Sequence, residues 1–171
     1  EETIPALARI LAKHHGFKCT VLFGIDAETG NITAGHNNMP GMEALDSADG
    51  LVIFARFLAL PDEQMKHLDD YLKRGGPVVG LRTSTHAFNY PKDSTAKYAK
   101  HSWGYKGDDF TGGFGHQILG QSWVGHYGKN HKQSTRITIV DGKATHPILR
   151  GVKDIHVQCG GYNAEPQDDW N

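Results

Sequence analysis

Apolar and polar positions follow the helical and extended periods in clearly separated parts of the chain. Apolar residues recur every three to four positions near the start, which predicts a helix over residues 4–15. Residues 17–23 are apolar and β-branched, which predicts a strand. The continuous apolar run at residues 51–55 predicts a second strand, of the kind covered on both faces in a parallel sheet.

The helix with the clearest boundaries is predicted to begin at Pro61 and to end before Gly75. Acidic residues occupy its first turn and basic residues its last, as the helix dipole favours. The apolar run at residues 77–81 follows and predicts a third strand. The order helix, strand, strand, helix, strand predicts an open parallel α/β sheet in a single domain that spans residues 1–171.

Two more strands are expected near the C-terminus. Residues 135–140 alternate between polar and apolar, an Asp141-Gly142 turn follows, and residues 155–157 are extended in character. Parallel α/β units normally begin with a strand, whereas the first element here is a helix. We therefore expect the first strand to come from residues preceding Glu1 or from another chain.

Charge and composition exclude several classes of partner. The 18 Lys and Arg balance 19 Asp and Glu to a formal net charge of −1, so no basic field is available to attract nucleic acid. No stretch approaches the ~18 apolar residues of a membrane span. We expect a soluble protein, and the sequence leaves open its compartment, cytoplasmic or exported, and its oligomeric state, homo-oligomers included. Cys19 and Cys159 fit neither a redox motif nor a zinc ribbon.

Several short segments together resemble one protein family. They are ETIPAL at residues 2–7, DEQM at 62–65, GGPVVGLR at 75–82, GGFG at 112–115 and HPILRG at 146–151. With these segments the chain resembles the ThuA-like (trehalose-utilisation) family of the class I glutamine amidotransferase-like superfamily. The resemblance implies a three-layer α/β/α, flavodoxin-like fold with an open, mostly parallel sheet, and an association with carbohydrate metabolism.

The amidotransferases of that superfamily carry a cysteine nucleophile at a strand-to-helix turn of the form G-x-C-x-G. In this chain the matching segment, residues 80–84, has Arg82 in the cysteine position and Ser84 in the second glycine position. Arginine stays protonated, so it binds anionic groups but does not attack a carbonyl. The sequence therefore disfavours glutaminase activity.

The polar segment after the third predicted strand is the first candidate site, because ligands of open α/β sheets bind at the carboxyl ends of strands. Arg82 is a candidate catalytic anchor, and His86 is a candidate catalytic acid or base near neutral pH. The hydroxyls of Thr83, Ser84 and Thr85 are candidate substrate ligands. In the alternative interpretation the hydroxyls cap a helix and Arg82 pairs with a structural carboxylate.

A glycine-, histidine- and aromatic-rich stretch supplies the other candidates. Gly113, Trp123 and Tyr127 are candidate substrate-binding residues, since aromatic rings offer flat apolar faces to a sugar. His126 and His131 are candidate ligands for a zinc-like divalent metal, although their five-residue spacing matches no established motif. In the alternative interpretation the aromatic residues pack a long loop onto the sheet.

These residues lead to one functional hypothesis and one alternative. The hypothesis is a site for a carbohydrate or sugar-derived substrate at the carboxyl ends of the strands, with hydrolase, lyase or isomerase chemistry assisted by acid–base groups or a metal. The alternative is a non-catalytic sugar-binding or interaction domain that has lost amidotransferase chemistry. Whether the protein is an enzyme is left open by the sequence.

Overall fold

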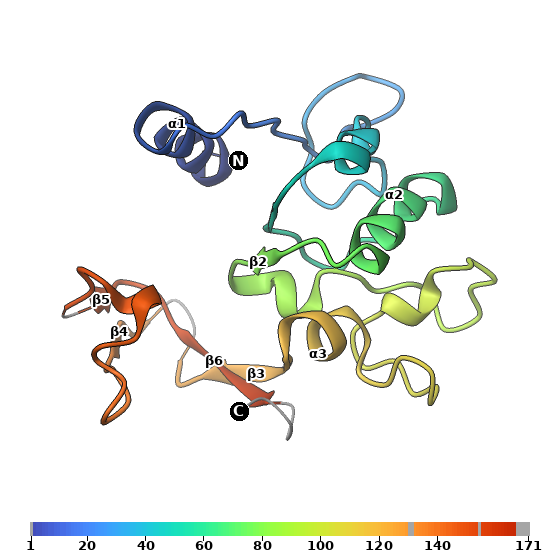
Figure 1. Ribbon diagram of the computed structural model, residues 1–171. Coiled ribbons are helices and arrows are strands. Elements are labelled where there is room, and N and C mark those ends of the chain that lie inside the picture. Colours follow the sequence, from blue (N-terminus) through green and yellow to red (C-terminus); the bar gives the residue numbers. More distant parts are fainter. Residues whose placement is uncertain (1, 130–131, 154, 167–171) are drawn as a thin grey trace. The chain divides into compact units, whose positions relative to one another are not determined.

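The computed structural model describes residues 2–129, 132–153 and 155–166 (Figure 1). Its helices are α1 (Thr3–His15), α2 (Asp62–Lys73) and α3 (Gly113–Leu119), and four short 3-10 segments are η1 (Met42–Ser47), η2 (Arg82–His86), η3 (Ala99–His101) and η4 (Pro147–Leu149). Its strands are β1 (Leu51–Ile53), β2 (Val78–Gly80), β3 (Gln121–Tyr127), β4 (Thr135–Ile137), β5 (Ile155–Val157) and β6 (Gly161–Pro166).

The chain divides into two compact units. The first contains the residues up to Ser122 together with Pro166, and the second contains residues 123–165. In the first unit β1 and β2 form a parallel pair, with Leu51 opposite Val78 and Ile53 opposite Gly80. In the second unit β4 and β5 are antiparallel, and β3 pairs with β6.

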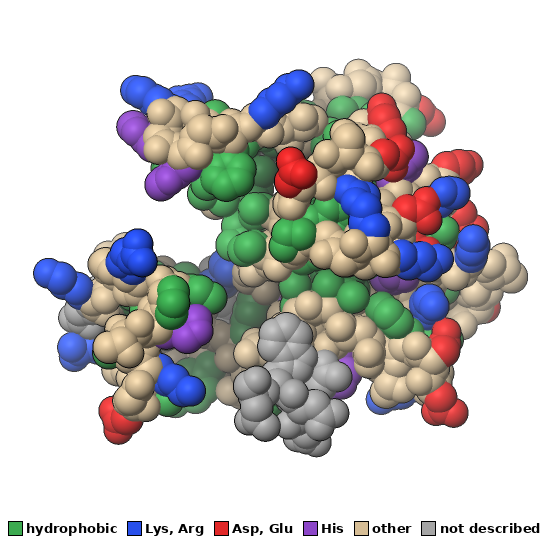
Figure 2. All heavy atoms as spheres, in the orientation of Figure 1, with side chains coloured by type: hydrophobic (Ala, Val, Ile, Leu, Met, Phe, Trp, Pro, Cys, Tyr) green, Lys and Arg blue, Asp and Glu red, His purple; other side chains and the backbone are tan. Residues whose placement is uncertain are grey.

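Helix α2 supplies the centre of the core in the first unit. Its buried face consists of Met65, Leu68 and Tyr71, which follow helical spacing. The Tyr71 hydroxyl donates to the Pro77 carbonyl at 2.7 Å, which ties the helix to the chain entering β2. The opposite face of α2 carries acidic and basic side chains next to each other (Figure 2), such as the pair formed by Lys73 and Asp69 at 2.7 Å. One face of α2 therefore faces the core and the other faces solvent.

Aromatic rings fill the rest of this core. Phe88 and Phe114 meet edge to face, with ring centroids 5.2 Å apart. His101 is buried beside them and lies 4.9 Å from the Phe110 ring, and its Nδ1 is 3.2 Å from the Tyr98 carbonyl. Burial lowers the pKa of the His101 imidazole, because the surrounding rings disfavour its charged form.

Two glycines bring α3 into direct contact with the backbone of other segments. A Cβ atom on Gly115 would lie 2.0 Å from the Thr85 carbonyl oxygen in η2. A Cβ atom on Gly113 would lie 2.0 Å from the Ser102 carbonyl oxygen. Because a carbonyl oxygen in the backbone cannot rotate away as a side chain does, only glycine allows α3 to approach this closely.

The predicted three-layer α/β/α, flavodoxin-like fold is wrong for this structure. Within the described residues the strands form three two-stranded sheets, and only β1 and β2 are parallel. A parallel sheet of the predicted kind is covered by helices on both faces. Here Val79 is 56 % exposed and Phe54 is 43 % exposed, and α1 buries none of its residues. The layers that the fold requires are therefore not formed.

The strand predicted over residues 17–23 is also wrong. These residues are extended coil, and no described residue forms a ladder with them. Extended propensity produces a strand only when a neighbouring strand supplies the cross-strand contacts. We expected a further first strand only as a member of that large sheet, so the reason for expecting this strand no longer holds. The helices predicted over residues 4–15 and between Pro61 and Gly75 are confirmed as α1 and α2. The strands predicted at residues 51–55, 77–81, 135–140 and 155–157 are confirmed as β1, β2, β4 and β5.

No helix in the described part of the chain combines the length and the apolar character that crossing a bilayer requires.

We expect Gly115→Ala to lower the free energy of unfolding by about 2–3 kcal/mol, as overpacking of a fixed site does. Gly115 does not have a positive φ, so the loss would come from steric contact with the carbonyls of Thr85 and Gln121 rather than from backbone strain. Urea denaturation measures it. Gly50→Ala is the matched control, because a Cβ atom there meets nothing within 4 Å. Equal stabilities of the two variants would contradict the close approach of α3.

We expect the stability of the protein to fall as the pH is lowered from about 7 to 5, and His101→Phe to reduce this dependence. In the unfolded chain His101 titrates near ~6.5, whereas burial lowers its pKa in the folded protein. The unfolded state therefore binds the extra proton first, and folding loses stability below that pH. Urea titrations across this pH range measure the effect. The same pH dependence of stability in the unmodified protein and in His101→Phe would contradict this prediction.

Candidate functional site

The carboxyl ends of β1 and β2 continue side by side beyond the strands. The Leu81 N–H donates to the Ile53 carbonyl at 2.9 Å, and the Phe57 N–H donates to the His86 carbonyl at 2.9 Å. Leu58 then forms an isolated parallel bridge with Phe88. This pairing places residues 54–58 along η2, so the groups after both strands lie on one edge.

Two of the predicted substrate ligands form hydrogen bonds between the two segments of this edge. The Thr83 hydroxyl donates to the Ala55 carbonyl at 2.8 Å. The fully buried Ser84 hydroxyl donates to the Ile53 carbonyl at 2.7 Å. Their protons are therefore used by the main chain of the neighbouring segment. Thr85 is half-buried, and its Oγ1 lies 3.3 Å from Nδ1 of His86.

The backbone is strained at one position after each strand. Phe57 has φ 52° and Arg82 has φ 42°, and these are the two non-glycine residues with positive φ in the described part of the chain. This conformation costs an L-residue roughly 1–2 kcal/mol. Such strain persists where the surrounding structure enforces it, and it concentrates at functional sites. Both side chains are exposed at the surface.

Aromatic rings cluster on this edge. The Phe57 ring centroid lies 5.0 Å from that of His86 and 6.0 Å from that of Trp103. Trp103 is half-buried, whereas His86 is only 3 % exposed. We call the four residues Phe57, Arg82, His86 and Trp103 the Arg82 edge. It combines a permanent cation with an apolar ring surface.

Arg82 and His86 both lie on η2, and the structure adds a residue that the sequence analysis missed. Phe57 follows the second predicted strand, but its ring contacts are with residues distant along the chain, so the sequence pattern did not single it out. Gly113 is buried at the start of α3, where it meets the Ser102 carbonyl rather than solvent. Its position indicates a role in packing.

The remaining predicted site residues belong to the second unit. Trp123, His126 and Tyr127 lie on β3, and the His126 ring centroid is 5.9 Å from that of Trp123 and 5.3 Å from that of Tyr162. His131 lies outside the described residues. Among the residues that are described, no group of three or more His, Cys, Asp or Glu side chains is placed to hold a metal ion.

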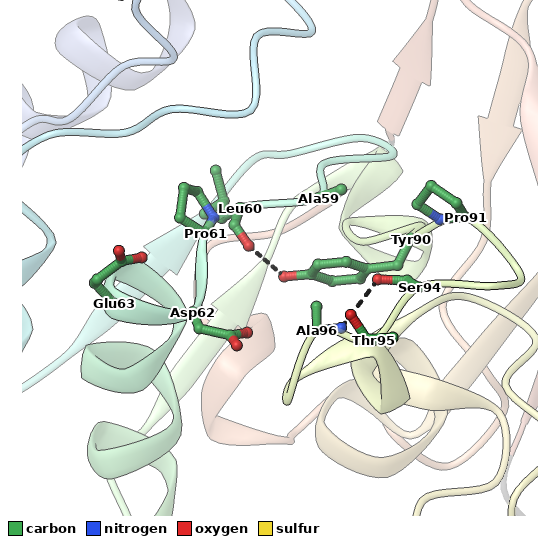
Figure 3. A pocket seen from close by; sticks show the side chains of 10 residues that line it. All are labelled: Ala59, Leu60, Pro61, Asp62, Glu63, Tyr90, Pro91, Ser94, Thr95 and Ala96. Atoms are coloured by element: carbon green, nitrogen blue, oxygen red, sulfur yellow. Dashed lines mark hydrogen bonds between the residues drawn. The ribbon is translucent and has the colours of Figure 1, made fainter.

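A pocket of about 550 Å³ lies between the start of α2 and residues 90–96 (Figure 3). The Tyr90 hydroxyl donates to the Leu60 carbonyl at 2.7 Å across it, and burial raises the pKa of Tyr90. Asp62 accepts the Lys97 N–H at 3.2 Å. The Tyr90 hydroxyl and the Asp62 carboxylate thus already have partners within the protein.

Comparisons of the chain with protein-family models, with curated proteins and with solved structures find no match.

We expect Arg82→Gly to be more stable than Arg82→Ala by about 1 kcal/mol, because alanine retains the strain of a positive φ and glycine does not. Thermal or urea denaturation of both variants measures the difference. Lys66 in α2 provides the matched control, since in a helix interior the alanine variant is the more stable one. The same order at both positions would contradict strain at Arg82.

Proposed function

We propose that the Arg82 edge binds a small sugar-derived acid. The observation that carries this proposal is the exposed side chain of Arg82 on a strained backbone, in a segment that pairs with the segment carrying Phe57. Strain of this kind has no benefit for stability, so a function for the residue explains why it is there.

The chemistry of the edge fits such a ligand. A guanidinium group binds a carboxylate through two parallel hydrogen bonds, which fixes the orientation of the ligand as well as its position. The exposed ring of Phe57 and the half-buried ring of Trp103 offer an apolar surface to the C–H groups of a sugar. The resemblance of the sequence to ThuA-like proteins supports a ligand from sugar metabolism.

The burial of His86 favours binding over acid–base chemistry at this edge. A general acid or base must reach the reacting group within hydrogen-bond distance. His86 is 3 % exposed, its Nδ1 lies beside the Thr85 hydroxyl, and its ring centroid lies 5.0 Å from that of Phe57. In this proposal His86 therefore supports the Phe57 ring, and Thr83 and Ser84 hold the edge in place without contacting the ligand.

We expect D-glucuronate to bind the full chain more tightly than D-glucose in isothermal titration calorimetry. Arg82→Gly should weaken glucuronate binding about tenfold or more, the usual effect of losing a hydrogen bond between charged groups. Arg82→Lys should weaken it less, because the charge remains and the paired geometry is lost.

Arg9→Ala is the matched control, since Arg9 is an exposed arginine on α1. Trp103→Ala tests the ring surface and should reduce the affinity for glucuronate more than that for acetate. Unchanged glucuronate affinity in Arg82→Gly would overturn the proposal, as would equal affinities for glucuronate and glucose.

A further inference from the structure

A second pocket lies entirely within the second unit. It has a volume of about 380 Å³ and is lined by Tyr127, Lys132, Gln133, Ser134, Thr135 and Gly160. These residues come from the end of β3, the segment leading into β4, and the approach to β6. A pocket of this volume is within the range of sites for small organic ligands.

Hydrogen bonds of the lining residues leave donor groups that a ligand could use. The Gln133 side-chain oxygen accepts the Lys129 N–H at 2.6 Å, so the amide nitrogen is the part of Gln133 left for a ligand. Ser134 Oγ lies 3.0 Å from Nε2 of His156. When this ring nitrogen donates to the hydroxyl oxygen, the hydroxyl proton is available to a ligand. Lys132 forms no ion pair with any described residue.

The floor of the pocket is fixed by the strands. The Thr135 hydroxyl donates to the Cys159 carbonyl at 2.7 Å, and Thr135 is paired with Val157 in the antiparallel ladder. A Cβ atom on Gly161 would lie within 4 Å of both Thr135 and Tyr127, which shows how closely β6 approaches them. Tyr127 itself is 68 % exposed, so the face of its ring is open to a ligand.

The charge of the pocket and of its unit favours an anion. The residues that line the pocket include a lysine, an amide and three hydroxyls but no carboxylate. Residues 123–165 contain six Lys and Arg against three Asp and Glu, although the whole chain carries a net charge of −1. Basic side chains predominate over the part of the surface that carries β4 and β5 (Figure 2).

We propose that this pocket binds a small phosphorylated ring compound, such as a sugar phosphate. Lys132, Gln133 and Ser134 provide three donor groups for the terminal oxygens of one phosphate, and lysine supplies the point charge that such a group favours. The ring of Tyr127 provides the apolar surface for the rest of the ligand. The site shares no residue with the Arg82 edge, so each proposal stands or fails separately.

The test compares D-glucose 6-phosphate, inorganic phosphate and D-glucose as ligands of the ¹⁵N-labelled full chain, with binding followed by NMR chemical shifts. We expect glucose 6-phosphate to bind most tightly and to shift the amides of residues 132–135 and Gly160. Lys132→Ala should weaken its binding about tenfold. Tyr127→Ala should weaken the binding of glucose 6-phosphate but not that of inorganic phosphate.

Lys143→Ala is the matched control, because Lys143 is an exposed lysine of the same unit that does not line the pocket. Arg82→Gly should also leave glucose 6-phosphate binding unchanged, which separates this site from the Arg82 edge. The proposal is overturned if glucose 6-phosphate shifts no amide of the pocket. It is also overturned if Lys132→Ala and Lys143→Ala weaken binding equally.

Discussion

Main-chain pairing between residues 51–58 and residues 78–89 is the interaction on which the first unit depends. It begins as the parallel ladder of β1 and β2 and continues through the hydroxyl of Ser84 to the bridge between Leu58 and Phe88. Such pairing satisfies backbone groups that burial would otherwise leave without partners. It also fixes the positions of Phe57 and Arg82, so the fold of this unit and its candidate site have a common origin.

The same pairing explains why α2 and α3 are arranged as they are. Tyr71 ties α2 to the chain that enters β2, and Gly115 brings α3 against the backbone of η2. Both helices therefore contact the backbone of the paired segments, α2 through the Tyr71 hydroxyl and α3 through the close approach at Gly115. The hydrogen-bond donors of the pocket in the second unit do not depend on this pairing, because they lie around the β4–β5 ladder.

Local signals in the sequence predicted the elements that local interactions determine. Proline at the start, acidic residues in the first turn and glycine after the end specified α2, and apolar runs specified β1 and β2. The large sheet was predicted wrongly, because residues 17–23 depend on a partner strand that their own sequence does not specify. Arg82 could be selected from its position after a strand. The ring of Phe57 and the contacts of Gly113 depend on residues distant along the chain, so a local pattern does not reveal them.

The chain enters the second unit through β3 and leaves it through β6, and these two strands pair with each other. Backbone hydrogen bonds therefore hold both segments through which the second unit joins the rest of the chain. Segments of a protein open and close as cooperative units of different stability. Residues 123–165 carry their own strand pairings, so they can open without disturbing the buried core around α2.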